Sequence, residues 1–151
     1  MAAAATALWL AVPAGASSAA VTGTENFQLM STSATSSTSS VIATGVFTAG
    51  GVDHTGNKVD TFVFSNGSFK VAHSGPATQH FNPKTCLLTV VGHGTFKLSG
   101  GTGAYAKIKG AGTYKLNILA VGAKTATGKC TQKKPPTAFQ QIIKATGKVS
   151  L

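Results

Sequence analysis

Residues 94–116 read GTFKLSGGTGAYAKIKGAGTYKL, and this stretch is the strongest indication of the fold. Polar and apolar residues alternate from 95 to 98 and again from 104 to 109, which is typical of β-strands with one buried face. Between the two runs, Gly100-Gly101-Thr102-Gly103 interrupts the pattern. Glycines at this density mark turns, bulges or sharply coiled strands. The stretch therefore predicts two strands joined by a sharp corner.

Several glycines of this stretch are expected to serve backbone geometry and not chemistry. A chain that turns sharply between Ser99 and Ala104 needs backbone angles at positive φ, which glycine reaches without a Cβ clash. We expect such angles at Gly101 and Gly103. Two more glycines interrupt the alternation that follows, so the structural set is Gly100, Gly101, Gly103, Gly110 and Gly112.

Period-two patterns recur along the rest of the chain, and no helical period persists long enough to predict a helix. Asn66-Gly67 best fits a tight hairpin turn, and Gly92-His93-Gly94 is expected to turn the chain before the opening stretch. About eight short strands in one small domain predict an all-β fold, either a β-sandwich or a closed antiparallel β-barrel. Several strands are apolar on both faces, which favours the barrel because the second face can pack against a neighbouring subunit. Besides the opening stretch, strands are expected at 21–30, 41–48, 58–65, 68–74, 86–91, 114–121 and 138–149, with loops at 31–40, 75–85 and 122–137.

The 151 residues fit a single domain behind a short leader. Residues 1–20 carry no charge and hold an apolar run too short to span a bilayer, which is typical of a secretory signal peptide. Cleavage is expected after Ala16 or Ala20, and an apolar N-terminal strand is the alternative interpretation. Residues 21–40 would then form an N-terminal strand and a Ser/Thr-rich loop, and residues 41–151 the barrel body. No later segment is apolar for long enough to form a membrane helix, so we expect a secreted protein.

The chain has two cysteines, Cys86 and Cys130. An even number in an exported chain indicates one disulfide, which would tie a strand to the lysine-rich loop before the last strand. Two buried free thiols are the alternative. The spacing is not that of a zinc site, so no metal is predicted.

Charge is distributed very unevenly, with thirteen lysines, no arginine and a formal net charge of +10. The only acids are Glu25, Asp53 and Asp60. Such a surface attracts anionic polymers, including nucleic acid, acidic lipid headgroups and cell-wall phosphates. The lack of arginine argues against sequence-specific nucleic-acid recognition, which relies on bidentate guanidinium contacts. A solvated face that keeps the protein soluble is the simpler interpretation.

The order Gly-Gly-Thr-Gly, an aromatic residue, two spaced glycines and a tyrosine resembles the signature of the allene oxide cyclase and dirigent barrel superfamily. The match is LSGGTGAYAKIKGAGTY at 98–114, followed by a hydrophobic strand, a loop and a C-terminal strand in that family's order. The chain looks most like the exported bacterial members. The resemblance implies an eight-stranded antiparallel barrel, often a homotrimer, whose lumen holds a small apolar substrate and steers stereochemistry without a cofactor. It also implies a buried carboxylate near the substrate, and Glu25 is the residue in position to supply it, although the polar insertion after Met30 departs from the plant pattern.

Two residues are candidates for catalysis, Glu25 and His73. His73 shares one face of its strand with Phe69 and Val71, so it would be a titratable group of the lumen if that face points inward. A core histidine bonded to a backbone carbonyl is the alternative. The candidate ligand-binding residues are Phe69, Val71, Tyr105 and Tyr114.

Other polar residues are interpreted as structural. Asp53-His54, beside glycines, is expected to form a turn closed by an Asx hydrogen bond. His54, His73, His80 and His93 lack the close spacing of a metal-binding pair. The chain has no Gly-x-Ser-x-Gly nucleophile elbow, and its Gly-Gly-Thr-Gly lacks the lysine and helix of a phosphate loop.

Two functions remain open from the sequence. The first is a secreted barrel that binds a small apolar molecule in its lumen and promotes a cyclisation or isomerisation without a cofactor. The alternative is a non-catalytic cell-envelope protein that binds an anionic surface polymer through its lysines.

Overall fold

The computed structural model describes residues 20–151. The expected signal peptide, apart from its last residue, lies outside the described residues. Within them the chain forms eleven strands and one short 3₁₀ turn, η1 (Gly103–Tyr105). The strands are β1 (Thr22–Ser31), β2 (Thr38–Thr44), β3 (Thr48–His54), β4 (Val59–Phe64), β5 (Gly67–Ser74), β6 (Ala77–Asn82), β7 (Leu87–Ser99), β8 (Lys109–Val121), β9 (Ala123–Lys124), β10 (Cys130–Thr131) and β11 (Ala138–Ser150).

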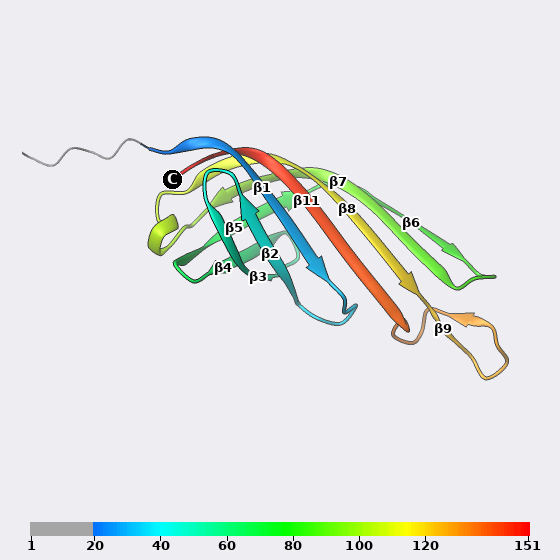
Figure 1. Ribbon diagram of the computed structural model, residues 1–151. Helices are drawn as coiled ribbons and strands as arrows, with labels where there is room; N and C mark the ends of the chain where they lie inside the picture. The colour runs from blue at the N-terminus through cyan, green and yellow to red at the C-terminus, as the bar shows by residue number, and fades with distance from the viewer. Residues whose placement is uncertain (1–19) are drawn as a thin grey trace, which may run out of the picture.

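Eight of these strands close into an antiparallel barrel, which confirms the predicted fold class and excludes the sandwich. The ring runs β1-β2-β3-β4-β5-β7-β8-β11 and returns to β1. Strand β6 lies outside the ring and pairs with the first half of β7. Strands β7, β8 and β11 are each 13 residues long, whereas β2 to β5 have 6 to 8 residues. The long strands therefore extend beyond the barrel as an open sheet (Figure 1).

Several local predictions are wrong, and most of the errors involve glycines. Gly92, Gly94, Gly110 and Gly112 lie inside the continuous strands β7 and β8 and do not end them. Gly112 faces Gly147 across β8 and β11, and a Cβ on Gly112 would overlap the carbonyl oxygen of Thr146. These glycines allow two backbones to approach closely.

The other errors concern strand limits. Residues 41–48, predicted as one strand, belong to β2 and β3 with a turn at Gly45 between them. Part of the predicted loop 75–85 is strand β6. The hairpin of β4 and β5 is confirmed, but its two-residue turn is Ser65-Asn66, one residue earlier than predicted.

The corner after β7 is a loop that contains η1, and the strand predicted at 104–109 does not form. Gly100 and Gly103 have positive φ angles of 59° and 56°, whereas Gly101 does not. Gly101 is required for a different reason, because a Cβ there would overlap the carbonyl oxygen of Tyr105. The loop docks on the β4–β5 hairpin, where the Ala104 N–H donates to the Asn66 carbonyl at 2.8 Å.

Aromatic rings fill the end of the barrel beneath this loop. Phe69 is fully buried, and its ring centroid lies 5.4 Å from that of Tyr105 and 5.6 Å from that of Phe62. Edge-to-face and tilted contacts between rings stabilise the core beyond the effect of burying apolar area. This end is therefore closed, and the opposite end, where the short strands stop, is the mouth. The buried or half-buried rings are Phe27, Phe47, Phe62, Phe64, Phe69, Phe96 and Tyr105.

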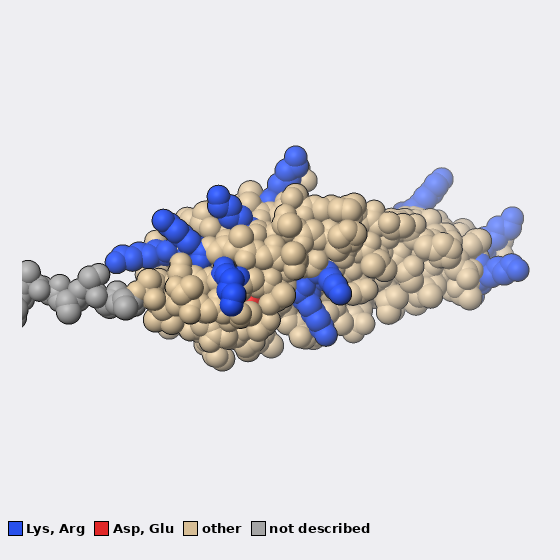
Figure 2. Space-filling view, turned by 90° about the horizontal axis from the view of Figure 1, so that it is seen from above, with Lys and Arg blue, Asp and Glu red and all other residues tan. Residues whose placement is uncertain are grey.

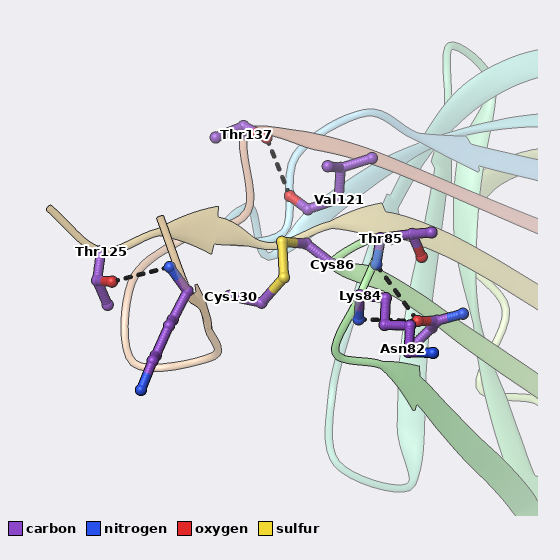
Figure 3. Close-up of a disulfide and its surroundings, with 9 residues drawn as sticks. Asn82, Lys84, Thr85, Cys86, Val121, Thr125, Cys130 and Thr137 are labelled. Carbon is purple, nitrogen blue, oxygen red and sulfur yellow. Dashed lines mark hydrogen bonds between the residues drawn. A yellow bond between two sulfur atoms is a disulfide. The ribbon is translucent and has the colours of Figure 1, made fainter. Parts of the chain in front are cut away.

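The predicted disulfide between Cys86 and Cys130 is present, with a Cα–Cα distance of 5.2 Å. It fastens β10 of the lysine-rich loop to the residue before β7 (Figure 3). Cys86 is fully buried, and its carbonyl accepts the Gly122 N–H at 2.8 Å. The bridge thus anchors a loop that has little apolar surface of its own. No helix within residues 20–151 is long and apolar enough to cross a membrane.

Candidate functional site at the barrel mouth

A pocket of about 120 Å³ opens at the mouth of the barrel. Its position follows from strand alternation, because every second residue of each strand points inward. The rings of Phe27, Phe62 and Phe96 separate it from the closed end. Leu116 and Ile143, from the long strands, form an apolar side that continues onto the open sheet.

The opposite side of the pocket is polar and contains His73 and Asp60. His73 Nε2 lies 3.3 Å from Asp60 Oδ1, and the same oxygen accepts the Gly56 N–H at 2.8 Å. His73 and Asp60 are half-buried and buried, respectively. The Tyr114 ring stands edge-on to the imidazole, with ring centroids 6.2 Å apart and an interplanar angle of 88°. A carboxylate that contacts an imidazole fixes its orientation and stabilises its charged form.

A second carboxyl group, Asp53, lies behind this pair on β3. It is 1% exposed, and within residues 20–151 its Oδ1 has no hydrogen-bond partner, whereas Oδ2 accepts the Thr55 hydroxyl at 3.3 Å. Burial, and next the negative charge of Asp60, raises the pKa of Asp53 to about 7. Asp53 therefore holds a proton more tightly than a solvent-exposed aspartate does.

The sequence-predicted site residues fall into two groups. Val71, His73 and Tyr114 line the mouth pocket, and most of the other residues that line it are apolar, as expected of a lumen. Phe69 and Tyr105 belong to the aromatic core of the closed end and are buried. They do not line the mouth pocket.

Glu25 also lies at the closed end, separate from His73. It is fully buried on the inward face of β1, and its Oε2 accepts the Phe47 N–H at 3.0 Å. Burial raises the pKa of Glu25. Hydrogen bonds from backbone groups, that of Phe47 first, lower the pKa by less than burial raises it. Burial raises the pKa of Tyr105, and the negative charge of Glu25 is a second, smaller cause of the same shift. The structure therefore does not bring the two candidate catalytic residues together.

The sequence interpretation missed Asp53 and Asp60. Asp53 is an inward-facing residue of β3, so the predicted Asx turn at Asp53-His54 is wrong. Alternation in VDTFVF places Asp60 on the same face as Phe62 and Phe64, and this signal could have identified it. Residues 20–151 contain no cluster of three or more potential metal ligands.

Comparison with family models, curated proteins and solved structures finds no match to this chain.

Proposed function

We propose that the protein binds a small, mainly apolar molecule at the barrel mouth and promotes a proton transfer on it, in a cyclisation or isomerisation that needs no cofactor. The observation that carries this proposal is the contact between His73 and Asp60 in a pocket that is otherwise apolar. An imidazole held by a carboxylate can take and return a proton near neutral pH. His73 is half-buried at the open mouth, so it can exchange that proton with solvent between turnovers.

The shape of the site favours an elongated ligand. The mouth pocket alone holds only a small group, but the inward faces of the long strands continue its apolar side through Ile118 and Val90, which are half-buried. This surface leads to a second pocket of about 160 Å³, which Leu88 and Phe139 line under the lysine-rich loop. The two pockets are four residues apart along β8, from Leu116 to Ala120, roughly 13 Å at the usual rise of a strand.

Binding is tested with a neutral fluorescent probe, N-phenyl-1-naphthylamine, because an anionic dye would also bind the lysines. Leu116→Trp fills the mouth pocket, and Val63→Trp places the same ring on the outward face of β4, where Val63 is 39% exposed. We expect Leu116→Trp to weaken probe binding at least tenfold and Val63→Trp to leave it unchanged. Equal binding by both variants, with melting temperatures near that of the wild type, would contradict the site.

Proton transfer is tested with molecules that co-purify with the protein, identified by native mass spectrometry. Incubated in D₂O with the wild type, such a molecule should gain deuterium at carbon. His73→Gln should abolish this gain while binding persists, because glutamine keeps polar contacts without a titrating group. Deuterium uptake unaffected by His73→Gln would rule out this role for the histidine.

We further propose that the protein is exported, that it assembles as a homotrimer, and that it belongs with the allene oxide cyclase and dirigent barrels. The disulfide supports an oxidising compartment, where such bonds persist. Exposed Val91, Leu119 and Val121 on the outward face of the long strands support a subunit contact. The closed eight-stranded ring agrees with the family resemblance. N-terminal sequencing of the culture supernatant and light scattering test export and assembly.

A further inference from the structure

The charged side chains are separated by sign between the inside and the outside of the molecule. Glu25, Asp53 and Asp60 are the only acids of the chain, and all three are buried, at 0%, 1% and 8% exposure. All thirteen lysines are exposed. Figure 2 shows lysines along the length of the molecule and almost no red. The lysines of the outer surface therefore have no exposed acidic side chain to neutralise them.

Five lysines lie on the outward faces of β7, β8 and β11, in the half of these strands nearer the closed end, and we call this half, with the adjoining outward face of β1, the outer wall. The five are Lys97, Lys109, Lys115, Lys144 and Lys148. Lys115 and Lys144 lie directly opposite each other on β8 and β11, and His93 lies opposite Lys115 on its other side. Like charges directly opposite across strands destabilise a sheet. With no acid nearby, a bound anion would relieve this repulsion.

A second pair of lysines lies on the outer wall nearer the closed end. Lys97 and Lys148 flank Ala111 in one cross-strand row. This row is four residues from the Lys115–Lys144 row along each strand, roughly 13 Å. The row between them carries hydroxyl and amide side chains without charge, namely Thr95, Thr113, Thr146, Asn26 and Thr44.

A groove of about 470 Å³ crosses the outer wall at the Lys115–Lys144 row and the uncharged row beside it, and the Lys97–Lys148 row lies beyond its lining. Lys115 and Lys144 line it together with the hydroxyls of Thr113 and Thr146 and the amide of Asn26. It is distinct from the mouth pocket, because these side chains point away from the lumen. The groove thus presents two ammonium groups and several neutral hydrogen-bonding groups on one face of the barrel wall.

We propose that the outer wall binds a linear anionic glycan, whose acidic groups pair with the two lysine rows and whose hydroxyls bond to the threonine and asparagine row. Such a polymer carries acidic groups and hydroxyls along the same chain, and the wall offers both ammonium groups and uncharged hydrogen-bonding groups to them. A single-stranded nucleic acid fits less well, because its bases stack on exposed aromatic rings. No phenylalanine or tyrosine within residues 20–151 is classed as exposed.

The test measures binding to alginate, a carboxylate-bearing glycan, and to dextran sulfate, with neutral dextran as the charge control and poly(dT) as the nucleic-acid control. The variant Lys115→Gln/Lys144→Gln removes two charges from the wall. The matched variant Lys133→Gln/Lys134→Gln removes two exposed charges from the disulfide-anchored loop. A third variant, Thr113→Val/Thr146→Val, removes the central hydroxyls and keeps every charge.

We expect binding to one or both anionic glycans, with affinity that falls steeply as salt rises. The wall variant should lose at least tenfold in affinity, the loop variant less than twofold, and the threonine variant several-fold. The melting temperature of the wall variant should equal or exceed that of the wild type, because a like-charge pair is removed. Equal losses in the wall and loop variants would show diffuse attraction and overturn the site. Failure to bind either glycan, or tighter binding to poly(dT), would overturn the glycan assignment.

Discussion

Replacing Asp53 by asparagine tests the electrostatics of the barrel mouth directly. Burial and the Asp60 charge raise the pKa of Asp53 from 3.8 to about 7. Between these values the folded protein holds a proton that the unfolded chain has released. The contribution to stability is therefore fully present below pH 4, decreases as the pH rises, and is lost above about pH 7. Asparagine has the shape of the protonated acid and does not titrate, so the variant should lack this dependence.

The magnitude follows from the pKa. From pH 5 to pH 8 the wild type loses roughly 2 to 3 kcal/mol of unfolding free energy through this group, with a slope of at most about 1.4 kcal/mol per pH unit. Urea unfolding at pH 5 and pH 8, at fixed ionic strength, measures the difference between the two proteins. Titrating groups remote from Asp53 are common to both and cancel. We expect the unfolding free energy of Asp53→Asn minus that of the wild type to be higher at pH 8 than at pH 5 by that amount.

Glu25→Gln provides the comparison, because burial also raises the pKa of Glu25. Its effect should have the same sign, and the effects of the two variants should add because the carboxyls lie at opposite ends of the barrel. If Asp53→Asn and the wild type lose the same stability between pH 5 and pH 8, Asp53 is ionised in the folded protein. The description of Asp53 as a buried carboxyl with a raised pKa would then be wrong.

Two further predictions concern the backbone and the disulfide. Gly103→Val should lower the unfolding free energy by roughly 1 to 3 kcal/mol in thermal or urea unfolding, because the φ of Gly103 is 56° and a Cβ would overlap the Asn66 carbonyl oxygen. Gly50→Val is the control and should be nearly neutral, because the space around a Cβ at Gly50 is open. Equal stability of the two variants would contradict the strained corner. Cys86→Ser/Cys130→Ser should lose about 4 kcal/mol, from the 44-residue separation of the cysteines, and reductant should then have no further effect on its unfolding. A wild type whose stability is insensitive to reductant would contradict this prediction.

Strand alternation was sufficient to predict an all-β fold and most of its strands, and the strands that are apolar on both faces favoured the barrel over the sandwich, which the closed ring confirms. It did not reveal where strands end. Gly112 looks like an interruption in the sequence, and only its pairing with Gly147 shows that it permits close approach of two strands. In the same way, alternation places Asp60 inside, but its contact with His73 depends on the register between β4 and β5, which no local pattern encodes.

The separation of acids and lysines makes the two proposed sites respond to different variables. The probe for the mouth is neutral, so salt should affect its binding little, whereas pH changes the charge of Asp53 behind the pocket. On the outer wall the binding groups are exposed lysines, so glycan binding should weaken steeply as salt rises. If one variant changed both the pH dependence of probe binding and the salt dependence of glycan binding, the two ligands would share a single site. Independent responses, each abolished by its own variant, are what two separate surfaces of one barrel require.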